Sequence, residues 1–228
     1  MSARAVVFDC LGTLCEITRP THPYRDVLAQ LQKHFQPPAK HAIMTRDWSF
    51  EEALAQLGGP LDPEAARALQ IRLADELDSI AFFKESISVL RELRLRGYKV
   101  AICANIPKPY AEQVDRMLDD AVDERTFSYA CGFVKPDRRI FQDVQAKLRM
   151  PAEDIVMVGT EHLADYSGAR AAGMRALHLT RPLAGQAHPV GPARTGAISR
   201  MTDLLYYLPP LPIAASSSLA NPARLGRA

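Results

Sequence analysis

The sequence predicts an α/β protein in which a parallel β-sheet is flanked by helices. Short apolar segments typical of strands alternate with segments of helical periodicity, which is the pattern of parallel-sheet proteins. The chain has 228 residues, of which 47% are hydrophobic and 24% are charged, so it can bury a sizeable core. The stretch 16–82 carries only helical signals, which indicates an all-helical insertion after the first strand.

The strands and helices of the core follow in order along the chain. Ala5 to Phe8 is an apolar strand that ends at Asp9, because Gly12 and Thr13 then break it. The remaining elements are a helix at 87–93 that ends at Gly97, a strand at Lys99–Ala104, a helix at 140–148, a strand at 154–158, a helix at 163–172 that ends at Gly173, and a strand at 175–179. Parallel strands place their carboxyl ends at one edge of the sheet, where α/β proteins bind ligands.

The insertion has its own helix signals. Ser49 and Glu52 fit a capping box, Asp62 and Pro63 begin another helix, and Val27, Leu28 and Leu31 repeat with helical spacing. An insertion directly after the first strand would overhang the ligand edge of the sheet. It is either a packing unit or a lid over the site, and its position favours the lid. We therefore expect a core of residues 1–15 and 83–208 and a helical cap of residues 16–82.

The C-terminal part is less regular. Residues 181–197 are rich in Gly, Pro and Ala and predict a loop, whereas Ile198 to Leu208 predicts a last helix. Prolines and serines then mark residues 209–228 as a low-complexity, disordered tail.

Charge and cysteine usage limit the classes of partner. The chain has 28 Lys and Arg residues against 26 Asp and Glu, a net charge of +2, without runs of one sign. This argues against nucleic acid and membrane surfaces as partners, and we expect a cytoplasmic monomer or homodimer. Cys10, Cys15, Cys103 and Cys131 have neither metal-site spacing nor the density of a disulfide framework, which predicts buried free thiols.

Four segments at predicted strand ends carry candidate chemistry: Val6–Leu14, Ala104-Asn105, Lys135-Pro136-Asp137 and Val158–Asp165. Asp9 stands before a Gly-Thr turn that leaves its carboxylate exposed and offers N–H groups to an anion. Asp9 is therefore a candidate nucleophile, and Gly12 and Thr13 are candidate substrate-binding residues. On this segment alone, an Asp that merely caps the turn is equally consistent.

In order and in position, these segments resemble the four motifs of haloacid dehalogenase-like (HAD) hydrolases. The resemblance implies a Rossmann-like core, with Asp9 forming a covalent aspartyl intermediate and Lys135 stabilising negative charge. It also implies that Asn105 binds a small anionic substrate, a phosphate ester or a haloacid. Asp9 and Asp165 would be the ligands of a magnesium ion.

Three positions depart from the family pattern. Leu11 stands where phosphatases of the family have an acid/base Asp, and leucine cannot transfer a proton. A non-acidic residue there resembles the dehalogenase branch. Ala104 lacks the hydroxyl of the usual Ser or Thr, and Thr160 replaces a carboxylate ligand, which weakens the magnesium site.

Other residues keep two interpretations each. Asp165 either supports a metal or bonds Lys135, Glu161 could replace the missing ligand if it reorients, and His162 is either a base or simply exposed. Arg25 and Arg46 are candidates for the substrate-binding arginine of the dehalogenase branch. The function is accordingly a hydrolase with Asp9 as nucleophile, or a catalytically degenerate protein retained for binding, scaffolding or regulation.

Overall fold

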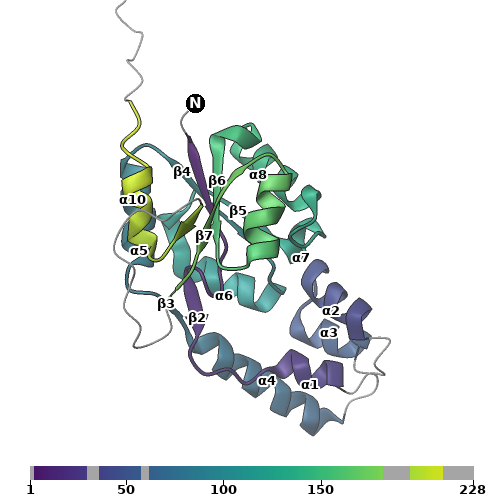
Figure 1. Cartoon of the computed structure of the whole chain (residues 1–228). Coiled ribbons are helices and arrows are strands. Elements are labelled where there is room, and N and C mark those ends of the chain that lie inside the picture. The colour runs from purple at the N-terminus through teal and green to yellow at the C-terminus, as the bar shows by residue number, and fades with distance from the viewer. Residues whose placement is uncertain (1–2, 30–35, 58–61, 182–195, 213–228) are drawn as a thin grey trace, which may run out of the picture.

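The computed structural model describes residues 3–29, 36–57, 62–181 and 196–212 and confirms the α/β fold (Figure 1). Within these residues, six parallel strands form one sheet in the order β5-β4-β1-β6-β7-β8. The strands are β1 (Ala5–Phe8), β4 (Lys99–Ala104), β5 (Glu124–Phe127), β6 (Ile155–Gly159), β7 (Arg175–Leu179) and β8 (Ala197–Ile198). Because β1 lies between β4 and β6, Asp9 is placed at the centre of the carboxyl edge.

Helices cover both faces of this sheet. They are α5 (Ser86–Leu95), α6 (Lys108–Leu118), α7 (Ser128–Cys131), α8 (Arg138–Leu148), α9 (Gly168–Ala171) and α10 (Leu204–Tyr207). Side chains of β1 alternate between the two faces: Val6 and Phe8 pack with α5, α6 and α10, whereas Ala5 and Val7 pack with α8 and α9. All four β1 residues are fully buried, so the strand before Asp9 is rigidly held.

The inserted segment lies beyond the carboxyl ends of the strands, at the bottom of Figure 1. Its helices are α1 (Pro23–Ala29), α2 (Gln36–Thr45), α3 (Phe50–Leu57) and α4 (Pro63–Asp78). Both expected starts are present, since Ser49 and Glu52 bond reciprocally before α3 and Asp62 caps α4. Leu31 lies outside the described residues.

The prediction that 16–82 is purely helical is wrong at both ends. β2 (Cys15–Ile17) and β3 (Ile80–Phe82) pair as a two-stranded antiparallel sheet where the chain leaves and re-enters the core. Each strand has only three residues, which is too short for an alternating pattern to emerge. Their pairing partner is also distant in sequence, so local signals do not reveal it.

A buried carboxylate joins the insertion to the core. Glu76 of α4 accepts hydrogen bonds from the Tyr110 hydroxyl of α6 at 2.7 Å and from the His22 N–H at 2.6 Å, and it also bonds Thr21. Burial alone would raise the pKa of Glu76, but the Tyr110 hydroxyl and these N–H groups outweigh it and lower that pKa. The carboxylate is thus held ionised between the two parts of the chain.

The C-terminal predictions need correction. Ile198 belongs to β8 rather than to a helix, because it pairs with Leu179 of β7. A short helical turn starts only at Met201, where Asp203 accepts the Ser199 and Arg200 N–H groups. The 209–228 segment is not wholly a tail, since Leu211 N–H bonds Arg96 O and Pro209 O accepts from the Tyr98 hydroxyl. Residues 182–195 and 213–228 lie outside the described residues.

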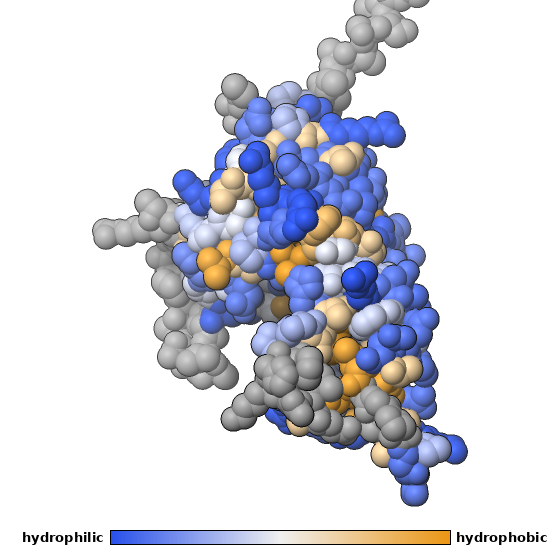
Figure 2. Space-filling view, turned by 90° about the vertical axis from the view of Figure 1, so that its right-hand side faces the viewer, coloured by the Kyte–Doolittle hydropathy of each residue, from blue (hydrophilic) through white to orange (hydrophobic). Residues whose placement is uncertain are grey.

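The visible surface is largely hydrophilic, with small apolar patches on the core and on the insertion (Figure 2). Among the described residues, none of the helices combines the length and the hydropathy needed to span a bilayer.

We predict that Glu76→Gln lowers the free energy of unfolding by about 2 kcal/mol at neutral pH, because a buried charge-assisted network is broken. Since the pKa of Glu76 is lowered in the folded state, its contribution to stability is complete above the ordinary glutamate pKa of 4.5 and is lost as the pH falls through the folded pKa. Urea unfolding at several pH values measures this.

The control is Glu92→Gln, which breaks the more exposed Glu92–Arg96 pair and should cost less than about 0.5 kcal/mol. Equal losses of unfolding free energy for the two substitutions at neutral pH would contradict the stabilising role of the ionised Glu76 carboxylate. A loss for Glu76→Gln that persists in acid would contradict it as well.

Candidate active site

The nucleophile candidate Asp9 stands at the first residue after β1. Its N–H donates to Val158 O at 2.9 Å, and its Oδ2 accepts the Thr13 hydroxyl at 3.1 Å. Gly12 has φ +85, a left-handed conformation that lets the chain turn back beneath the carboxylate. Gly12 and Thr13 therefore shape the loop around Asp9, while their predicted contact with substrate stays a prediction.

Lys135 is the buried cation of the site. Its Nζ donates to Asp9 Oδ1 at 2.7 Å, to Asp165 Oδ1 at 2.6 Å and to Cys103 O at 2.7 Å, and the residue is 4% exposed. Burial alone would lower the pKa of Lys135, but the Asp9 and Asp165 carboxylates outweigh it and hold that pKa above its usual value. Lys135 is consequently an ammonium at every physiological pH.

Asp165 comes from the π-helical turn His162–Ser167 after β6. Its Oδ2 accepts the Glu161 N–H at 2.9 Å, and the residue is 1% exposed. Burial raises the pKa of Asp165, with Lys135 acting in the opposite direction. A Cβ on Gly159 would collide with Asp165 Oδ2, so only glycine leaves room for this carboxylate.

Asn105 follows β4 and holds the lysine segment in place. Its Nδ2 donates to Lys135 O at 3.0 Å, and its Oδ1 accepts the Lys135 N–H at 2.7 Å. Both polar ends of the amide are thus engaged with backbone. The structure gives Asn105 a positioning role, and its substrate-binding role stays a prediction.

A cavity of about 110 Å³ opens beside Asp9. Its lining is Asp9, Cys10, Leu11, Ala104, Asn105, Ile106, Lys135, Glu161, Ala164 and Asp165. Leu11 and Ala104, two of the departures from the family pattern, form part of an apolar wall. Three carboxylates face one ammonium in this lining, which makes the cavity formally negative.

The thiols near the site are protonated. All four cysteines are free, and Cys131 is half-buried whereas the other three are buried. The hydrogen bond with Cys15 and burial raise the pKa of Cys10, and burial raises the pKa of Cys103 to about 12. Neither thiol is a nucleophile at neutral pH.

The donor set does not fit the magnesium ion that the resemblance implies. All four carboxylate oxygens of Asp9 and Asp165 already accept hydrogen bonds, and one oxygen of each is bound to Lys135. Within the described part of the chain, no three His, Cys, Asp or Glu side chains group as metal ligands. Thr160, at the third ligand position, points at Gly12 instead.

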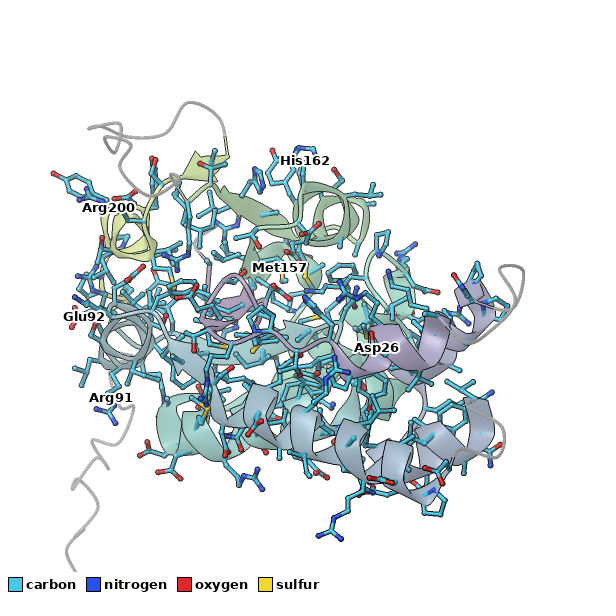
Figure 3. All side chains as sticks on the ribbon, turned by 90° about the horizontal axis from the view of Figure 1, so that it is seen from below. Asp26, Arg91, Glu92, Met157, His162 and Arg200 are labelled. Atoms are coloured by element: carbon cyan, nitrogen blue, oxygen red, sulfur yellow. The ribbon has the colours of Figure 1, made fainter. Side chains whose placement is uncertain are left out.

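Three candidates lie away from the cavity. His162 does not line the cavity and packs against Tyr166 and His178. Figure 3 views the molecule from the side of the insertion: Met157 of the central strand β6 is near the middle, whereas His162 is at the periphery. Arg25 and Arg46 are exposed on the insertion and do not line the cavity either. Their role as the substrate-binding arginine of the dehalogenase branch stays a prediction.

Sequence reasoning missed two contributors. The Cys103 carbonyl binds Lys135, which only the packing of β4 beside β1 reveals. Arg181 bonds Thr13 O, although a single arginine after a strand gives no sequence signal.

Comparison with known proteins identifies the same family as the sequence motifs. The family model of haloacid dehalogenase-like hydrolases matches residues 3–173. Haloacid dehalogenase-like hydrolase domain-containing protein 3 of Homo sapiens is 28% identical over 150 residues, which are 63% of this chain and 60% of the human protein. Phosphoserine phosphatase of Thermus thermophilus is 33% identical over 140 residues, 60% of this chain and 55% of that enzyme. The matches thus span little more than half of these relatives.

Solved structures share the fold. A HAD phosphatase from Thermococcus onnurineus has a TM-score of 0.61 at 22% identity, covering 91% of this chain and 98% of its own. A 2-haloacid dehalogenase from Pseudomonas syringae has a TM-score of 0.64 at 18% identity, covering 90% and 98%. The expected fold is therefore confirmed over almost the whole chain.

We predict that Lys135→Met destabilises the protein by about 3–5 kcal/mol at mildly alkaline pH, because two buried carboxylates lose their counter-ion. Burial raises the pKa of Asp165, and without the ammonium nothing opposes this effect, so the loss of stability should shrink as the pH falls. Urea unfolding at acidic and alkaline pH measures both effects.

Lys147→Met is the control, since the Lys147–Asp143 pair is about one-third exposed and should cost less than about 1 kcal/mol. If Lys135→Met lowered the free energy of unfolding no more than this control, the account of a buried ammonium between two charged carboxylates would be contradicted.

Proposed function

Because the chain belongs to the haloacid dehalogenase-like hydrolase family, we propose that Asp9 is its nucleophile and that its substrate loses a leaving group without needing a proton. A halide leaving a short haloacid is the simplest such case. The observation that carries the proposal is the contact of Asp9 with the Lys135 ammonium, at a cavity where Leu11 replaces the usual acid.

The reaction has two steps. An Asp9 oxygen attacks the carbon that bears the halogen, the new C–O bond forms, and the halide departs with the electrons of the C–X bond. Water then attacks the Asp9 carbonyl carbon, which releases the hydroxy acid and a proton and regenerates the carboxylate. Lys135 lies at hydrogen-bond distance from Asp9 Oδ1, where it stabilises the oxyanion of the second step.

Two features disfavour a phosphate monoester without a metal. Leu11 cannot protonate an alkoxide leaving group. In addition, Asp9, Asp165 and Glu161 outnumber Lys135 in the lining, so a dianionic phosphate meets more repulsion than a monoanionic haloacid. Magnesium would relieve that repulsion, but the donors at hand do not make a site for it.

A non-catalytic role is the alternative. Its support is that Leu11 and Ala104 leave an apolar wall and that the Asn105 amide is occupied by backbone. Such a protein would keep the fold and bind a ligand or a partner without turnover.

The insertion completes the proposal as a cap. Helices α1–α4 lie beyond the carboxyl edge of the sheet (Figure 1), and the Glu76–Tyr110 contact fixes α4 to α6. A cap in this place excludes water from the cavity while the first step proceeds.

We predict halide release from 2-chloropropionate that is insensitive to chelator. Asp9→Asn should lower the rate on the order of 10³-fold or more, because the attacking oxygen is lost. The control Asp154→Asn, at the opposite end of β6 and paired with Arg4, should stay within about twofold. Halide and phosphate release are measured with 2-chloropropionate, p-nitrophenyl phosphate and acetyl phosphate, with magnesium and with chelator.

Magnesium-dependent phosphate release without halide release would make the protein a phosphatase instead. Wild-type rates equal to those of Asp9→Asn on every substrate would remove the hydrolase proposal and leave the binding role. Leu11→Asp combined with Thr160→Asp would then reveal a degenerate phosphatase if activity appeared.

A further inference from the structure

We propose that Arg181 is a positioning residue that fixes the Asp9 loop, residues 9–15, against the return segment, residues 80–86, through which the chain re-enters the core from the insertion. The contact itself is independent of the reaction, whereas its effect on rate rests on the proposed function.

The Arg181 guanidinium bridges two segments that are far apart in sequence, the Asp9 loop and the return segment. Nη2 donates to Thr13 O at 2.7 Å, Nη1 donates to Glu85 Oε1 at 2.7 Å, and the guanidinium carbon stands 3.8 Å from the centre of the Phe83 ring. Charge-assisted bonds of this kind are short and directional, and the Arg181 and Glu85 side chains are only 23% and 27% exposed. The bridge is therefore largely shielded from water.

The bridge acts on the residue that bonds the nucleophile. Thr13 donates its hydroxyl to Asp9 Oδ2 at 3.1 Å while its carbonyl accepts from Arg181. Fixing the Thr13 backbone therefore fixes the direction from which its hydroxyl reaches Asp9. Arg181 does not itself line the cavity, so it acts through Thr13.

The next residue of the loop is tied to the same return segment. Leu14 O accepts the Phe83 N–H at 3.1 Å and the buried Ser86 hydroxyl at 2.6 Å. Together with the Arg181 bridge, these contacts tie two successive carbonyls of the Asp9 loop to the return segment. The position of the nucleophile is thus coupled to the place where the insertion joins the core.

The geometry requires a guanidinium. Its two Nη groups reach a carbonyl and a carboxylate at once while its central carbon lies over an aromatic ring, and a lysine ammonium has no such fork. Lysine at this position could retain one of the two bonds. Arg181→Lys should consequently keep part of the effect.

Hydrogen exchange of the intact protein tests the bridge without any substrate. In Arg181→Met, the amides of residues 10–15 should exchange on the order of tenfold faster than in the wild type, because local opening costs less. Arg181→Lys should be intermediate. The matched control is Arg96→Met, since Arg96 has 19% side-chain exposure and bonds Glu92 and the carbonyls of Leu205 and Leu208 at another place in the fold.

Exchange of residues 10–15 that is no faster in Arg181→Met than in Arg96→Met would overturn the proposal. This readout separates the two variants even if both lower the unfolding temperature equally.

Halide release from 2-chloropropionate tests the effect on Asp9. Arg181→Met should lower kcat on the order of tenfold with KM within about twofold, because a misplaced nucleophile slows the first step more than binding. In a Thr13→Val background, Arg181→Met should lower kcat by less than about twofold, since both substitutions act on the same interaction, the bond of the Thr13 hydroxyl to Asp9. If Arg181→Met lowers kcat by the same factor in the Thr13→Val background as in the wild type, Arg181 does not act through Thr13 and the proposal is overturned.

Failure of the wild type to release halide would contradict the proposed function alone, and the exchange experiment would still decide the role of Arg181.

Discussion

The burial of one ammonium between two carboxylates is the constraint on which the site depends. Lys135 Nζ lies within 2.7 Å of Asp9 Oδ1, Asp165 Oδ1 and Cys103 O. Buried ions tolerate little misplacement, because each unpaired charge costs several kcal/mol. Three neighbouring parallel strands satisfy this demand by ending at the same edge. Gly159, where a Cβ would collide with Asp165, shows how closely the backbone is adapted to the cluster.

The central strands and the cluster could be predicted from the sequence. β1, β4 and β6 are apolar segments buried on both faces, and the shared carboxyl edge of β1 and β6 brings Asp9 and Asp165 together. Lys135 comes from the loop between α7 and α8, and its place beside Asp9 was implied by the family resemblance. The edge strand β5 (Glu124–Phe127) was missed because it begins with two charged residues. β2, β3 and β8 have three residues or fewer and depend on partners distant in the chain.

Single polar residues were harder to assign than motifs. Asn105 lines the cavity, and its expected contact with substrate stays a prediction. The bonds of its amide to the Lys135 backbone were not foreseen, because they depend on how the loop after β4 packs. Arg25, Arg46 and His162 were chosen by residue type, and the described structure has them outside the cavity lining. Arg181 became visible only through its bond to Thr13 O, since nothing in the local sequence distinguishes it.

The central claim is that Asp9 forms an ester that water cleaves at the aspartyl carbonyl. A single turnover of 2-chloropropionate in ¹⁸O-labelled water, with excess protein and mass spectrometry of the peptide that contains Asp9, tests it most directly. The account predicts one ¹⁸O atom in the Asp9 carboxylate and unlabelled lactate. Labelled lactate with an unlabelled Asp9 would mean that water attacks the substrate directly, and would contradict the account.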